Sequence, residues 1–90
     1  MAKANVDPAE LRRFAKGLLQ FNRDLQQMMS AMNARTNALG QSWQDQEQQR
    51  FAQEVQYTLK SLNRFLDASE EHAQFLNRKA AHVEEYLKQR

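Results

Sequence analysis

The amino-acid sequence predicts an all-α fold: one antiparallel hairpin of two long helices. Three observations lead to this class. The 90 residues include only two Gly and one Pro, and helix-favouring Gln, Leu, Ala, Glu and Arg are abundant while β-branched residues are few. Apolar residues recur at spacings of three and four on both sides of one central break. That break contains Trp43, the only tryptophan, and a chain of this length forms a single domain, residues 1–90.

The first helix is expected over about residues 8–39. Asp7 is a good N-cap, Pro8 suits the first helical position, and Glu10 completes a pattern that resembles a capping box. Gly40 is a natural residue to end the helix. The apolar residues have heptad-like spacing, which favours packing against another helix at a shallow angle. This first row consists of Leu11, Phe14, Leu18, Phe21, Leu25, Met28 and Met32.

A bend is expected over about residues 40–44, followed by a second helix over about residues 45–88. Asp45 suits the positive end of that helix dipole. Neither Gly nor Pro occurs after Gly40, so the second helix has no strong breaker. A short bend makes two long helices antiparallel neighbours. The second row consists of Val55, Leu59, Leu62, Leu66, Ala73, Leu76, Ala80, Val83 and Leu87, with Ser69 as a polar exception.

The apolar surface is wider than a single helix–helix seam requires. Leu19 and Met29 flank the first row, and the second row is flanked by Phe51, Phe65, Phe75 and Tyr86. Exposed apolar area of this extent usually marks an interface. We therefore expect two hairpins to pair as a four-helix bundle, most simply a homodimer about a two-fold axis, with a heterodimer as the alternative. The residues expected to hold hairpin and dimer are the first row, including Met28 and Met32 in the bundle core, together with Val55, Leu59, Leu62, Phe65, Leu66, Leu76 and Val83.

Several functions are disfavoured by composition and spacing. A net charge of +2, with acids and bases interspersed, argues against nucleic-acid binding. His72 and His82 do not share a helical face at ligand spacing, and the Glu-x-x-His pattern of di-metal bundles is absent. Phosphate-binding and nucleophile motifs are also absent. We expect no enzymatic activity, catalytic residue, metal, cofactor or small-molecule substrate. The N-terminal residues lack the apolar core of a signal peptide, and no apolar run is long enough to span a bilayer.

The whole chain resembles the WXG100 family, the small Esx-like substrates and partners of type VII secretion. The resemblance rests on the length, the two amphipathic helices and the tryptophan in the bend. The Trp-x-Gly signature of the family corresponds to Trp43-Gln44-Asp45, in which an acid replaces the glycine. The family's C-terminal signal, Tyr-x-x-x-Asp/Glu, has its nearest counterpart at Tyr86, but Arg90 stands where the acid is expected.

The resemblance implies a non-enzymatic protein that is made in the cytoplasm and secreted without a cleavable signal peptide. It also implies contact with the export ATPase of a type VII system, with Trp43 and Tyr86 of the opposing chain forming the recognition end. The base at Arg90 is compatible with a homodimer that uses a different signal, or with a partner that supplies the signal. Trp43 has a compatible packing role, sealing the open end of the hairpin. The alternative function is a cytoplasmic helical adaptor that binds a partner helix and is not exported.

Overall fold

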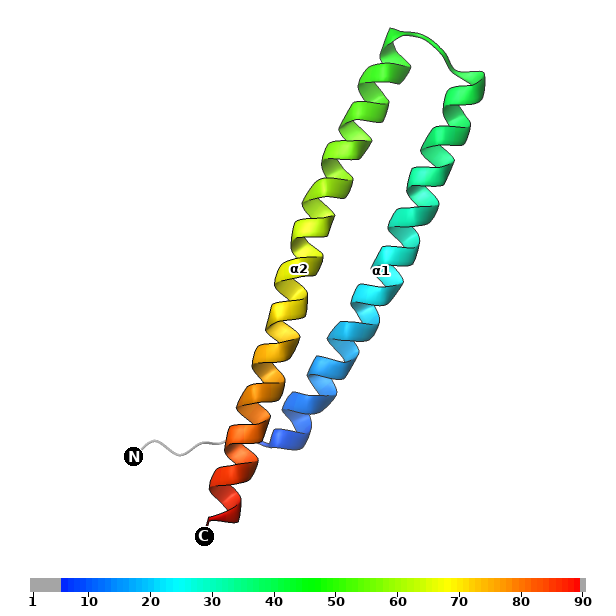
Figure 1. Ribbon diagram of the computed structural model, residues 1–90. Helices are drawn as coiled ribbons and strands as arrows, with labels where there is room; N and C mark the ends of the chain where they lie inside the picture. The colour runs from blue at the N-terminus through cyan, green and yellow to red at the C-terminus, as the bar shows by residue number, and fades with distance from the viewer. Residues whose placement is uncertain (1–5, 90) are drawn as a thin grey trace.

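The computed structural model describes residues 6–89 and confirms the all-α hairpin (Figure 1). Helix α1 spans Pro8–Ser42 and helix α2 spans Gln46–Lys88. The molecule extends over 68 × 21 × 14 Å, with a radius of gyration of 20.2 Å. A compact domain of this length would have a radius of gyration of about 12 Å. The hairpin is therefore a rod, with the bend at one end and the start of α1 and end of α2 at the other.

The cap of α1 forms at the predicted residue. Asp7 Oδ1 accepts a hydrogen bond from the backbone N–H of Ala9 at 2.9 Å, and Pro8 occupies the first helical position. The carboxylate of Glu10 pairs with Arg13 Nη2 at 2.6 Å instead of completing a capping box with Asp7. The helix start is thus set by one side-chain cap and by the fixed backbone angle of proline.

The bend is shorter than predicted, because α1 continues through Gly40 to Ser42. Gly40 does not end the helix, and no glycine among residues 6–89 has positive φ. A Cβ atom on Gly40 would lie 3.1 Å from Nε2 of Gln48, so the glycine makes room for this side chain from α2. The helix ends where Trp43 adopts extended backbone, with φ −128° and ψ 106°.

Asp45 caps α2, in agreement with its predicted place at the positive end of the helix. Its Oδ1 accepts a hydrogen bond from the backbone N–H of Gln48 at 2.9 Å. Glu47 adds a second acid in the first turn. Together these residues start α2 immediately after the bend.

The seam between the helices follows the predicted row on α2 but not on α1. The buried residues of α2 are Leu66, Ser69, Ala73, Ala80 and Val83, all in the second row or its polar exception. The buried residues of α1 are Ala15, Asn22 and Thr36, none of which belongs to the first row. The seam of α1 is therefore rotated from the predicted one, and Leu11, Leu18 and Leu25 are half-buried.

Side-chain size explains this rotation. Ala15, Ser69, Ala73 and Ala80 are each at most 2% exposed and lie in the half of the rod near the termini. Small side chains allow the two backbones to approach closely, whereas a phenylalanine ring at the same position would hold them apart. The large rings of the first row consequently lie outside the seam.

Candidate functional site

Two polar contacts, far apart along the rod, join the helices on one long edge of the hairpin. Near the termini, Arg12 Nη2 and Nε donate to the two carboxylate oxygens of Glu84 at 2.8 and 3.0 Å. Nearer the bend, Gln56 Nε2 donates to Asn33 Oδ1 at 2.9 Å. Arg12 and Asn33 are separated by three heptads and therefore lie on the same side of α1. We call these four residues the polar edge.

The opposite edge carries exposed apolar side chains, which we call the open face. Their exposed fractions range from 42 to 66%. The open face consists of Phe14, Phe21, Met28 and Met32 on α1 with Phe51 and Phe65 on α2. Apart from Phe51, these residues were predicted to hold the hairpin and dimer, yet within one hairpin they remain largely in water. These side chains could pack in a core only if a second molecule covered the open face.

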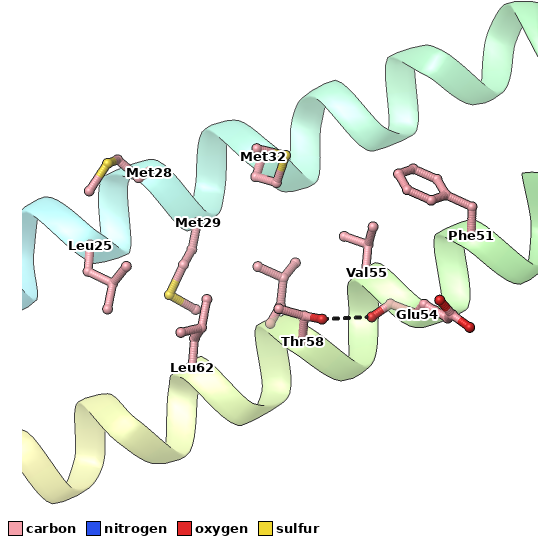
Figure 2. Close-up of a pocket in the computed structure, with 10 residues that line it drawn as sticks. Leu25, Met28, Met29, Met32, Phe51, Glu54, Val55, Thr58 and Leu62 are labelled. Carbon is pink, nitrogen blue, oxygen red and sulfur yellow. Dashed lines mark hydrogen bonds between the residues drawn. The ribbon is translucent and has the colours of Figure 1, made fainter.

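A groove of about 470 Å³ opens on this face in the half of the rod near the bend (Figure 2). Leu25 and Met29 extend from α1 toward α2, where Leu62 lies opposite them. The lining residues are Leu25, Met28, Met29, Met32, Phe51, Glu54, Val55, Thr58, Leu59 and Leu62. Met29 and Leu59 also line a hollow of about 460 Å³ that includes Asn33 and Gln56 of the polar edge. The seam is thus incompletely filled near the bend.

Two aromatic pairs connect parts of the open face. The rings of Phe21 and Phe65 meet edge to face, with centroids 6.2 Å apart and an interplanar angle of 82°. The rings of Trp43 and Phe51 have centroids 5.8 Å apart and are tilted by 36°. Because Phe51 also lines the groove, it links the bend directly to the open face.

Trp43 and Tyr86, the two residues that match the motifs of the WXG100 family, lie at opposite ends of the rod. Trp43 is half-buried at the bend, where its backbone N–H donates to Leu39 O at 3.0 Å. Gln44 Nε2 donates to Gln41 O at 3.3 Å in the same bend. Tyr86 is 67% exposed near the end of α2. Trp43 and Tyr86 therefore do not meet within one chain, and Arg90 lies outside the described residues.

The ion pair of the polar edge perturbs the titration of both partners. The hydrogen bonds from Arg12 lower the pKa of the Glu84 carboxyl below its usual value, and Glu84 raises the pKa of Arg12. Both side chains are almost half exposed to solvent. This pair joins the two helices at the surface, where water and salt weaken the attraction.

The side chains that could bind a metal ion are dispersed over the described residues. Across residues 6–89, no three His, Cys, Asp or Glu side chains gather as a metal site would require. His72 and His82 are both exposed. Neither helix in the described range has a stretch apolar enough to cross a bilayer.

The sequence interpretation missed the seam positions Ala15, Asn22 and Thr36. A usable signal was present, because Ala15 and Asn22 alternate with Leu11, Leu18 and Leu25 at spacings of three and four. This alternative row on α1 shares its leucines with the predicted first row. Large residues dominate the hydrophobic pattern of α1, although small residues suit a close approach of two helices.

A search of curated proteins gave no match to this chain. Residues 3–86 match the WXG100 family, described as "Proteins of 100 residues with WXG". The matched range contains the bend with Trp43 and nearly all of both helices. Membership of this family implies an Esx-like small helical protein of type VII secretion. The hairpin, with its open apolar face and its single tryptophan in the bend, belongs to the WXG100 family.

Proposed function

We propose that this protein is a non-enzymatic type VII secretion substrate or co-secreted partner that acts by protein–protein contact. The open face carries the proposal. Six large apolar side chains lie along one edge of a rod whose other edge carries the polar contacts between the helices. Membership of the WXG100 family supports the assignment to type VII secretion.

The total exposed area supports pairing of two hairpins. The chain exposes 7355 Å², about 1,900 Å² more than the roughly 5,500 Å² typical of a folded monomer of 10.6 kDa. Stable homodimers commonly bury about 1,000–2,500 Å² on each chain. A four-helix bundle made from two copies would remove an area of this order from water and would fill the groove beside Met28 and Met32.

A mass measurement in solution tests this pairing. We expect native mass spectrometry and light scattering to give about twice the chain mass of 10.6 kDa. A monomer at every concentration would contradict the homodimer. Recovery of a complex with a second small helical chain would then favour the heterodimer.

The bend is the proposed recognition end. Trp43 is half-buried and rests on Phe51, so its position is defined while part of the indole stays accessible. An indole combines apolar area with one N–H donor, which suits a protein docking site. In an antiparallel dimer the bend of one copy lies near Tyr86 of the other, and an export ATPase would contact this end.

Export is tested by deleting the cognate export ATPase and comparing the protein in cells and in medium. We expect the protein to disappear from the medium and to accumulate in the cells. A cytoplasmic marker measured in the same fractions controls for lysis. An unchanged distribution would reject type VII export and favour the helical adaptor that is not exported.

A further inference from the structure

Neither the backbone angle nor a neighbouring atom of the hairpin requires glycine at position 17. Gly17 lies in the interior of α1, and its φ is not positive, so its backbone requires no glycine. A Cβ atom built on Gly17 meets no atom within 4 Å, so no neighbour in the hairpin requires the space. In a helix interior, glycine destabilises the helix more than any other residue except proline. Within one hairpin, position 17 therefore leaves open space where any other residue would place a side chain.

Gly17 is exposed and lies on α1 between two large residues of the open face. Phe14 and Phe21 are 66% and 49% exposed, and Leu18 is half-buried between them and the seam. Phe14, Gly17, Leu18 and Phe21 have the relation i, i+3, i+4 and i+7. Four residues in this relation surround one hole in knobs-into-holes packing. Because Gly17 has no side chain, this hole is larger than it would be with any other residue at position 17.

We propose that these four residues form a socket that receives one bulky apolar side chain from a second copy of this chain. This inference rests on the proposed function, because it requires the homodimer. The second copy is the occupant because the same face carries both parts of the contact, the socket and exposed large side chains such as Phe51 and Met32. A two-fold axis places such a face against itself, so each copy supplies one socket and one inserted side chain.

Filling the socket tests the proposal. In Gly17→Leu, a side chain occupies the space reserved for the second copy, while nothing in the hairpin obstructs it. The matched control is Ala34→Leu, which adds a leucine at an exposed position of the same helix. Ala34 lies about 220° around the helix from Phe21, away from the open face. Circular dichroism of the wild type and of each variant checks that helicity is retained.

Sedimentation velocity over a dilution series gives the dissociation constant of each dimer. We expect Gly17→Leu to raise this constant about tenfold or more, since overpacking occurs in two sockets of each dimer. Gly17→Ala should have a smaller effect in the same direction, and Ala34→Leu should match the wild type. A wild type that remains monomeric would overturn the homodimer and the socket together. A wild-type dimer that Gly17→Leu leaves unchanged or tightens would overturn the socket alone.

Discussion

Ser69 of α2 donates its hydroxyl hydrogen to Oδ1 of Asn22 on α1 at 2.9 Å, inside the seam of the hairpin. The two residues are 2% and 6% exposed. The other polar atom of the amide, Asn22 Nδ2, is buried without a partner among the described residues. A shift of one helix along the other would separate Ser69 from Asn22 and bury both polar groups unpaired. The pair therefore favours one register of α1 against α2.

Ser69→Ala should destabilise the hairpin, because it leaves Oδ1 of Asn22 buried without its donor. We expect the free energy of unfolding to fall by about 1–2 kcal/mol. Urea denaturation at one fixed protein concentration measures this change, since the proposed dimerisation would make stability depend on concentration.

The double variant Asn22→Leu with Ser69→Ala is the matched comparison. It removes both polar groups from the seam and fills the position of Asn22 with an apolar side chain. We expect it to be at least as stable as the wild type, because no buried group is then left unsatisfied. A double variant less stable than Ser69→Ala alone would contradict this account of the pair.

Met28→Glu should separate the proposed dimer without unfolding the hairpin. Met28 is 58% exposed in one chain, so a carboxylate there remains in water until a second copy approaches. Burying that unpaired charge would weaken dimerisation by about 3 kcal/mol, more than a hundredfold in the dissociation constant. Light scattering measures the change, and Gln27→Glu, at the neighbouring exposed position, is the control. Loss of helicity in Met28→Glu would show that Met28 supports the hairpin itself.

The contribution of the Arg12–Glu84 pair to the stability of the hairpin should decrease as the pH falls. The pKa of Glu84 is lowered in the folded chain, so its stabilising effect is complete above the normal carboxyl pKa. The effect is lost as pH falls through the lower folded pKa, while Arg12 stays charged. We expect the melting temperature of Glu84→Gln to lie below that of the wild type near neutral pH.

The difference in melting temperature between Glu84→Gln and the wild type should vanish in acid and shrink in high salt. Thermal unfolding followed by circular dichroism across this pH range provides the measurement. Glu85→Gln, which removes a carboxylate at an exposed neighbouring position, is the matched control. A difference that persists in strong acid would show that Glu84 acts through packing instead of charge.

Trp43→Ala should distinguish the two roles of the tryptophan, recognition by the export machinery and sealing of the end of the hairpin. Its ring packs on Phe51 outside the buried seam, so we expect the hairpin to keep its helicity and lose about 1–2 kcal/mol of stability at most. Secretion into the medium should fall sharply if the bend is the recognition end. Thermal melting and a secretion assay on the same variant provide the two measurements. A large loss of stability together with the loss of secretion would favour the end-sealing role, and Trp43→Phe would then restore both.

The row on α2 was predictable from sequence because its large and small residues follow one heptad pattern. On α1, two overlapping rows share Leu11, Leu18 and Leu25, one passing through Phe14 and the other through Ala15. Spacing alone cannot select between them, since both repeat at three and four residues. The predicted end of α1 at Gly40 was also wrong, since the helix continues to Ser42 and Gly40 lies close to the side chain of Gln48 instead of in a turn.

The sequence by itself determined two helices, their caps at Asp7 and Asp45, the single bend at Trp43 and the family. These features depend on residues close together in the chain, where cap hydrogen bonds and helix propensity act. Only the tertiary structure decided the rotation of α1, which pairs Asn22 with Ser69 and leaves Phe14 outside the seam. The physical reason is that this rotation depends on how closely two distant segments can approach, and small side chains in the seam set that distance.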